Sequence, residues 1–331
     1  ATIGREGATM GMTTRRESLL ALGLCVPSWA AAQDYPNRPV RLVVPFPPGG
    51  VVDISGRLLA EELARPLGAT VVVENKVGAG GTIGAEQAAR APADGYTLLL
   101  GGAATHAFAP WVYKSLRYDP TKDFVAITQF TEGPLALCVN ASSPVRTLDD
   151  FVRLMKTGGA ALNYASNGNG TYPHLSVELL SQALGAKPLH VPYPGGAQAI
   201  TALIAGEVQF SQNHIPVVQA HVKSGRLRVL ATTGTTRSQA FPDVPTLKES
   251  GIDVVASAWF GLFAPAGTPA AVVERIHQAT VVAARSPALR EKLAAQGDEV
   301  LVEGSARFQA LQVAELEKWR RVISDGGLKL N

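Results

Sequence analysis

The stretch Arg41-Leu-Val-Val-Pro-Phe-Pro-Pro-Gly-Gly-Val-Val-Asp-Ile-Ser-Gly-Arg57 predicts a strand, a tight loop and a helix in direct succession. A short β-branched run from Val40 to Val44 is typical of a buried strand, and apolar residues recur at helical spacing from Ile54 to Leu63. The loop therefore lies at the carboxyl end of a strand and leads into a helix N-terminus. Free backbone N–H groups and the helix dipole make such a position suitable for binding an anion.

The residues of this loop also suit close contact with a ligand. Pro47 and Pro48 have no N–H group and stiffen the chain, whereas Gly49 and Gly50 let the backbone turn and approach a ligand closely. Asp53 falls in the first helical turn, where a carboxylate complements the dipole and can accept hydrogen bonds from N–H groups. An ordinary strand–helix turn would show the same residues, so the rest of the chain must decide.

Composition sets the size and class of the protein. The chain has 331 residues, of which 46% are hydrophobic and 17% charged, enough for two domains or one large one with a core. The net charge of +3 is small and unclustered, so nucleic acid is not expected as a partner. The cysteines are Cys25 and Cys138, and Cys138 lies in an apolar run that predicts a core position and not a nucleophile.

Residues 1–32 are expected to be an N-terminal extension and an export signal. Arg15-Arg16 form a charged region, residues 19–26 an apolar segment, and an A-x-A cleavage site ends at Ala32, before Gln33. The apolar segment is far shorter than the roughly 20 residues that a membrane span needs. The paired arginines also suggest the twin-arginine export route. We therefore expect a periplasmic protein that is cleaved near Ala32/Gln33.

Beyond residue 33, short apolar runs alternate with amphipathic stretches, which predicts an α/β fold with mostly parallel sheets flanked by helices. The pattern occurs twice, and this suggests two similarly built lobes joined by two crossings of the chain. Lobe 1 is expected to comprise residues 33–134 and 256–331, and lobe 2 residues 135–255. Separate strands are expected at residues 124–128 and 135–140, and only helices after the apolar run that ends at residue 264.

Five loops share one expected geometry, in which the carboxyl end of a strand leads into a helix. They span residues 45–53, 101–106, 166–172, 193–196 and 211–214. Ligands of open α/β sheets bind in the crevice outside such strand ends. The five loops consist mainly of backbone N–H groups, hydroxyls and small residues, which predicts a binding cleft with no catalytic residue.

Other chemistry has weak support. The sequence contains no G-x-x-x-x-G-K-[ST], G-x-S-x-G or H-E-x-x-H motif. His174 and Glu178 are one helical turn apart, but no third ligand is evident, so we expect no metal and no cofactor. His106, His174 and His214 follow strands and either face the cleft or form local hydrogen bonds. A periplasmic enzyme acting on carboxylates remains an alternative, with Asp53 and His106 as the candidate acid/base pair.

Several motifs, in their joint order and spacing, resemble the solute receptors of tripartite tricarboxylate transporters, the Bug family. The resemblance covers about residues 35–325. The motifs are Pro45-Phe-Pro-Pro-Gly-Gly-Val-Val-Asp53 with Arg57, Val73-Glu-Asn-Lys-Val-Gly-Ala-Gly-Gly81, Asp94-Gly-Tyr-Thr-Leu98, Tyr164-Ala-Ser-Asn-Gly-Asn-Gly170, His190-Val-Pro-Tyr193, Val244-Pro-Thr246 with Glu249 and Gly251, and Ala264-Pro-Ala-Gly-Thr-Pro269.

The resemblance implies a periplasmic binding protein with two α/β lobes that close over a ligand, a Venus flytrap of the type II kind. Its ligand would be a small carboxylate, held by main-chain N–H groups, hydroxyls and ordered water. Its partners would be the subunits of a membrane transporter, and we expect it to be a monomer. A sensor that passes the ligand signal to a membrane kinase is the other receptor function we consider.

Carried onto this sequence, the resemblance and the loops together give a set of expected ligand-binding residues. The first lobe supplies the loop with Asp53 and a second segment, and the second lobe supplies a loop and a closing turn. The set is Phe46, Pro47, Pro48, Gly49, Gly50, Asp53, Ala103, Thr105, His106, Asn167, Gly168, Gly170, Thr171, Tyr193, Gly195 and Asn213.

Two positions depart from the family pattern. Pro194 stands where a lysine or arginine often follows the His-Val-Pro-Tyr motif, and this removes a cation and an N–H group. Gln209 stands where an aspartate is common. Both departures suggest a ligand with fewer anionic ends than a tricarboxylate.

Overall fold

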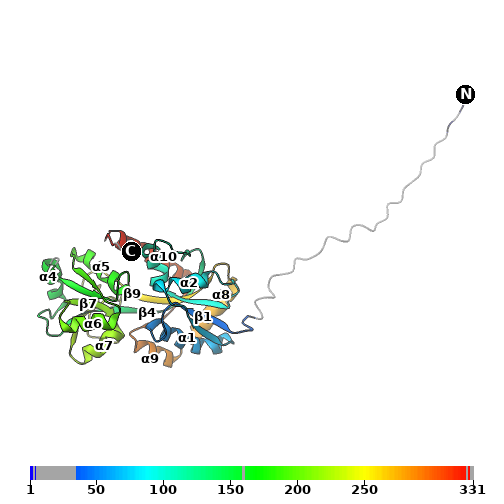
Figure 1. The fold of residues 1–331 in the computed structure, drawn as a ribbon. Helices are drawn as coiled ribbons and strands as arrows, with labels where there is room; N and C mark the ends of the chain where they lie inside the picture. Colours follow the sequence, from blue (N-terminus) through cyan, green and yellow to red (C-terminus); the bar gives the residue numbers. More distant parts are fainter. Residues whose placement is uncertain (3, 5–34, 159–160, 326, 329–331) are drawn as a thin grey trace. The chain divides into compact units, whose positions relative to one another are not determined.

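The opening stretch forms the strand β1 (Val40–Val44) and the helix α1 (Val51–Leu67), as the sequence predicts. The computed structural model describes residues 1, 2, 4, 35–158, 161–325, 327 and 328, and residues 36–331 form a unit of their own (Figure 1). The expectations for the export signal, its cleavage site and Cys25 fall on residues 5–34, outside the described part. No helix in the described ranges has both the length and the apolar character of a membrane span.

Strand β1 lies between two parallel neighbours, β2 (Val71–Asn75) and β3 (Thr97–Gly102). The helical segments of this part are η2 (Ala79–Gly81), α2 (Thr82–Ala89), η3 (Ala104–Phe108) and α3 (Ala109–Val112). The sequence predicted a loop over residues 101–106, but β3 continues to Gly102 and η3 begins at Ala104. The strand therefore passes almost directly into a helix, which buries the polar side chains of this segment.

A second group of elements repeats this pattern. It consists of α4 (Leu148–Gly158), β5 (Asn163–Ser166), α5 (Tyr172–Leu184), β6 (Leu189–Pro192), α6 (Gly196–Ala205), β7 (Phe210–His214), α7 (Ile215–Lys223) and β8 (Leu227–Thr232). Strand β5 pairs parallel with β6 and β7. Strand β7 extends to His214, so residues 211–214 are strand and not the predicted loop.

One long strand replaces the two that were predicted at residues 124–128 and 135–140. Strand β4 (Phe124–Asn140) pairs antiparallel with β9 (Ser257–Pro265) and β10 (Glu299–Gly304) along its first part, and with β7 and β8 along its second. The sheet order is β2-β1-β3-β9-β4-β7-β5-β6. Figure 1 shows β4 and β9 running between the helices α4–α7 and the helices α1, α2 and α8.

The C-terminal part contains the helices α8 (Ala270–Ala283), α9 (Pro287–Ala294) and α10 (Ser305–Asp325). Strand β10 interrupts the series of helices that the sequence predicted, because it pairs with the edge of β4. Helix α10 buries Trp319, which packs edge-on against Phe108 and Tyr172, with ring centroids 4.9 and 5.5 Å away. One indole therefore contacts both groups of elements.

Cys138 lies on β4 and is fully buried, as predicted, and burial raises the pKa of its thiol. We expect Cys138→Ala to lower the free energy of unfolding by about 1 kcal/mol and to leave ligand affinity unchanged, because the thiol acts only as a small apolar group. Cys138→Ser should cost more, since it buries a hydroxyl in an apolar cluster. Urea denaturation and ligand titration check both variants. A loss of ligand affinity in the folded alanine variant would contradict this interpretation.

Candidate ligand-binding cleft

A cavity of about 310 Å³ lies where the two groups of elements face each other. The starts of α1, α5 and α7 reach it, through Val51, Tyr172 and His214 respectively, and so do η3, α3 and β9. The residues at the three helix starts, Gly50, Thr171 and His214, make no side-chain hydrogen bond to the first turn that follows. Three positive helix ends thus converge on one cavity, and their N–H groups can bind an anion there.

The predicted site residues divide into three sets. Those that line the cavity are Phe46, Ala103, Asn167, Gly170 and Thr171. Pro47, Pro48, Gly49 and Gly50 are exposed and connect two lining residues, Phe46 and Val51. The others support the walls or lie outside the lining: Asp53, Thr105, His106, Gly168, Tyr193, Gly195 and Asn213.

Asp53 fixes the shape of the loop between β1 and α1. Its Oδ2 accepts hydrogen bonds from the backbone N–H of Gly49 (2.8 Å) and from Arg57 Nε (3.0 Å), and its Oδ1 accepts one from Asn75 Nδ2 (2.7 Å). Burial alone would raise the pKa of Asp53, but the hydrogen bonds from Arg57, Gly49 and Asn75 outweigh it and hold the pKa below its usual value. The ionised carboxylate therefore holds the loop, and direct contact with a ligand remains a prediction.

Thr105 and His106 are fully buried beneath the cavity. Thr105 Oγ1 accepts a hydrogen bond from the backbone N–H of Gly102 (3.1 Å) and lies 2.8 Å from His106 Nδ1. The imidazole stacks on Phe263, with ring centroids 3.8 Å apart. Burial lowers the pKa of His106 to about 3, so the ring is neutral at physiological pH. The pair follows the lining residues Ala103 and Ala104 in the chain and is not itself in the lining, and a direct ligand contact stays a prediction.

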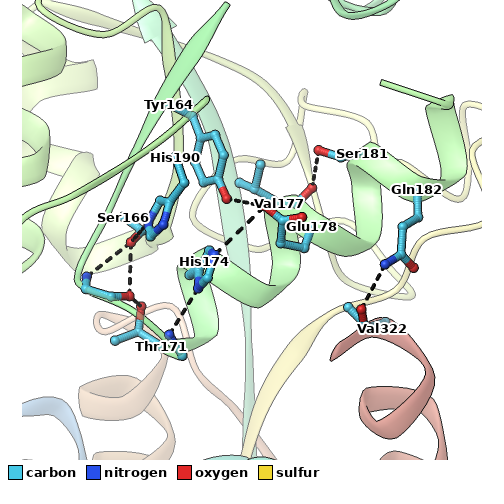
Figure 2. Close-up of polar contacts among 12 residues, drawn as sticks. Tyr164, Ser166, Thr171, His174, Val177, Glu178, Ser181, Gln182, His190 and Val322 are labelled. Atoms are coloured by element: carbon cyan, nitrogen blue, oxygen red, sulfur yellow. Dashed lines mark hydrogen bonds and ion pairs between the residues drawn. The ribbon is translucent and has the colours of Figure 1, made fainter. Parts of the chain in front are cut away.

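The loop before α5 is held by side chains that Figure 2 shows converging on it. Ser166 Oγ accepts from the N–H of Gly168 and donates to its carbonyl, both at 3.1 Å. Thr171 Oγ1 donates to the same carbonyl at 2.8 Å. His174 Nδ1 accepts from the N–H of Gly170 at 3.0 Å, which requires that Nδ1 carries no proton. These hydrogen bonds thus fix the backbone of this loop.

Two stacked imidazoles lie beside this loop. The rings of His174 and His190 are parallel within 8°, with centroids 3.8 Å apart, and Ser166 Oγ lies 2.6 Å from His190 Nε2 (Figure 2). Burial, and then the neighbouring His190, lower the pKa of His174 to about 3; burial lowers that of His190 to about 4. Tyr164 Oη donates to Glu178 Oε1 at 2.5 Å. His174 and Glu178, the pair that the sequence considered as metal ligands, belong to this hydrogen-bonded cluster. The described residues contain no group of three or more His, Cys, Asp or Glu that could hold a metal ion.

The remaining second-group residues support the wall indirectly. Asn213 on β7 is buried and exchanges hydrogen bonds with Asn167, whose side chain borders the cavity. Gly195 precedes α6, and Tyr193 Oη donates to Glu207 Oε2 at 3.1 Å. At one of the two positions that depart from the family pattern, Gln209 Oε1 accepts from the N–H of Asn163 at 2.8 Å. Gln209 thus joins neighbouring strands.

Of the aromatic residues in the lining, the sequence predicted only Phe46 as a site residue and missed Phe108, Tyr113, Trp259 and Phe260. His214, for which contact with the cleft was left open, also borders the cavity. The apolar run at residues 257–264 marks two of these aromatic residues, but a run of that kind is equally typical of a buried strand. The cavity thus joins apolar ring surface to helix N-termini, an arrangement suited to a ligand with an anionic end and an apolar body.

Known proteins resemble this chain over most of its length. Residues 55–328 match the family described as the tripartite tricarboxylate transporter family receptor. Protein BugT of Bordetella pertussis is 36% identical over 310 residues, which cover 93% of this chain and 94% of that protein. A protein from R. palustris, solved with adipate, is 32% identical with a TM-score of 0.77, over 89% of this chain and 99% of the other. MatC from Rhodopseudomonas palustris, with bound malate, is 33% identical with a TM-score of 0.73, over 87% and 100%.

The fold extends to more distant proteins. The aliphatic sulphonate binding protein SsuA of Escherichia coli is 16% identical with a TM-score of 0.51, over 85% of this chain and 86% of the other, a likeness of fold alone. With the more similar structures, this confirms the predicted α/β fold of a two-lobed periplasmic binding protein of type II.

Proposed function

Because the chain belongs to the tripartite tricarboxylate transporter receptor family, we propose that it captures a small dicarboxylate between its lobes and delivers it to the membrane subunits of such a transporter. Membership of this family makes the protein a periplasmic solute receptor and not an enzyme, in agreement with both sequence predictions. The similar structures with adipate and malate support a dicarboxylate as the ligand class.

The observation that carries the proposal is the convergence of the starts of α1, α5 and α7 on one cavity. One carboxylate would bind at the exposed glycine loop that precedes α1, and the other near Asn167 and Gly170. N–H groups and an amide would neutralise these charges without a paired arginine or lysine. Pro194 stands where such receptors often carry a lysine or arginine, and the loss of that cation favours two anionic ends over three.

Closure would take place about the crossing of β4 and β9. We propose lobe 1 as residues 33–134 and 256–331, and lobe 2 as residues 135–255. Ligand contacts to both lobes would shift the population toward the closed state and present a surface to the transporter. We further propose that the receptor acts as a monomer without nucleic acid, and that residues 1–32 are an N-terminal extension and an export signal, read by the twin-arginine route and cleaved near Ala32/Gln33.

A ligand titration of residues 33–331 tests this function. We expect adipate or malate to raise the melting temperature, since a ligand at 100 times its Kd adds about 2.7 kcal/mol to the stability of the folded state. Asn167→Ala should weaken binding about tenfold or more, because a hydrogen bond to a charged group contributes roughly 1.5–3 kcal/mol. Asn163→Ala, at the other end of β5, is the matched control and should bind normally. Tighter binding of citrate than of any dicarboxylate would overturn the proposed ligand class. If no carboxylate raised the melting temperature, the proposed receptor site would be overturned.

A further inference from the structure

A second cavity, of about 300 Å³, adjoins the strands that cross between the two groups of elements. It is bordered by residues 234–240 on one side and by the end of α9 and the start of β10 on the other. Ser257, the first residue of β9, lines this cavity, whereas the next residue, Ala258, lines the ligand cleft. Two cavities of similar volume therefore share one strand.

A buried carboxyl group without a hydrogen-bond partner lines the second cavity. Asp298 is only 8% exposed, and its Oδ2 has no partner among the described residues. The carboxyl group lies against the Cα of Gly133, where a Cβ would overlap Asp298 Oδ1. Burial raises the pKa of Asp298 to about 7. A ligand that brings hydrogen-bond donors and positive charge stabilises the ionised form of such a buried acid.

The other polar groups of the cavity define the same kind of ligand. Ser257 Oγ is also buried without a partner in the described residues, and a hydroxyl oxygen can accept a hydrogen bond. Of the two arginines in the lining, Arg237 pairs with Glu249 (Nε–Oε2, 2.8 Å), and Arg290 is exposed and donates through Nε to the carbonyl of Ala284 (2.7 Å). The cavity therefore has two buried acceptor atoms in its lining residues, Asp298 Oδ2 and Ser257 Oγ, that lack a partner among the described residues.

Two further acids line the cavity. Glu132 and Glu299 line the cavity beside Asp298, and burial, followed by the charge of Glu299, raises the pKa of Glu132. The described residues contain no group of three His, Cys, Asp or Glu arranged for a metal ion. The volume, at the lower end of that of small-molecule sites, suits a compact organic ion.

We propose that this cavity is a second binding site, which takes a small primary ammonium ion with Asp298 as its counter-ion and Ser257 as a second acceptor. The N–H groups of the ligand would satisfy both buried oxygens, and its charge would be balanced by the carboxylate. A quaternary ammonium has the charge but no N–H group and would leave both oxygens without a hydrogen bond.

The position of the site gives it a consequence that rests on the proposed function. Its two sides belong to the two proposed lobes, so closure over a carboxylate would change its width. Binding at the two cavities would then be coupled, and the coupling would be reciprocal: each ligand would change the affinity for the other by the same factor.

Calorimetric titration of residues 33–331 with ethanolamine and putrescine, each without carboxylate, tests the site. We expect one-to-one binding of at least one amine, at least tenfold weaker binding in Asp298→Asn, weaker binding in Ser257→Ala, and no binding of tetramethylammonium. Asp298→Asn keeps the side-chain shape and removes a buried acid, and thermal unfolding verifies that it folds. Equal binding of tetramethylammonium, unchanged affinity in Asp298→Asn, or no amine binding at all would overturn the proposal.

The cleft serves as an independent control. Asn167→Ala should leave amine affinity unchanged, and Asp298→Asn should still bind adipate or malate. If no amine binds, the titration with adipate or malate still tests the proposed function. If no dicarboxylate binds, the amine titration still tests the second site. An amine affinity that falls with Asn167→Ala would place the amine in the cleft and overturn the second site.

Discussion

Replacing His106 by asparagine should remove the contribution of one of four histidines, whose pKa values burial lowers to about 3 or 4, to the acid sensitivity of this protein. Between pH 7 and pH 4.5 the variant should gain about 2–3 kcal/mol of unfolding free energy relative to the wild type. The gain follows from the surroundings of the imidazole, which is fully buried between Phe124 and Phe263 and whose Nε2 has no partner among the described residues.

The direction of this change in unfolding free energy follows from the two pKa values of His106, in the folded protein and in the unfolded chain. The pKa is about 3 in the folded protein and about 6.5 in the unfolded chain. Well above pH 6.5 the imidazole is neutral in both states and does not affect the pH dependence. As the pH falls below 6.5, the unfolded chain takes up a proton that the folded protein cannot, so stability is lost until the pH approaches 3. Asparagine does not titrate, and the variant therefore lacks this loss.

Comparison with the wild type is necessary because buried acids act in the opposite direction. Burial raises the pKa of Asp298 to about 7, so the cost of burying its charge disappears as the pH falls. The difference between variant and wild type cancels this contribution. Thr105→Val is the matched control, since it removes the hydroxyl beside the ring and keeps the ring itself. Urea denaturation from pH 7 to 4.5 should give parallel curves for Thr105→Val and wild type, and a His106→Asn curve parallel to them would contradict the prediction.

The local elements of this chain were predictable because their signals lie within a few residues. The run from Val40 to Val44 and the Pro/Gly loop after it specify strand and turn without tertiary information. Cys138 was placed in the core by the apolar residues around it. The positive helix end behind Gly50 follows from the same local pattern, and it remains the strongest part of the site prediction.

Long-range pairing could not be predicted in the same way. Gly133 and Pro134 resemble a break between two strands, yet both pair with β9 because its Ala258 and Ser257 lie opposite. Strand β10 exists only because the edge of β4 accepts it. Trp319 is buried against Phe108 and Tyr172, neighbours that the helical pattern around it does not identify. Each of these outcomes depends on a partner more than 100 residues away in the chain.

The same limit applies to the cleft. A histidine at a strand end suggests a ligand contact, but burial decides whether the side chain supports the wall, as His106 does, or borders the cavity, as His214 does. The sequence placed both at equivalent positions. The backbone loops were easier to identify than the side chains between them, because glycine marks a required backbone conformation directly.

Among substitutions of a glycine by alanine in the loop before α5, Gly168→Ala should weaken ligand binding the most. Gly168 has φ +119°, a conformation that residues with a Cβ rarely adopt, and strain of this kind costs roughly 1–3 kcal/mol. Space is not limiting, since an added Cβ would meet Thr171 and Tyr193 only at 3.7 Å. The loop can relieve the strain only by rotating the peptide groups that Ser166 and Thr171 hold through hydrogen bonds to Gly168.

That rotation would misplace Asn167 and Gly170, the two residues of the loop proposed to bind one end of the dicarboxylate. We therefore expect the Kd for adipate or malate to rise at least tenfold in Gly168→Ala. Gly185→Ala provides the matched control, because Gly185 also has a positive φ (+64°) but follows the end of α5 with no atom near its added Cβ. It should cost about 1 kcal/mol of stability and leave the Kd unchanged. Calorimetry measures the Kd of both variants, and urea denaturation measures their stability. Equal losses of affinity would show that strain at either end of α5 weakens binding. A normal Kd in Gly168→Ala would show that this loop does not hold the ligand.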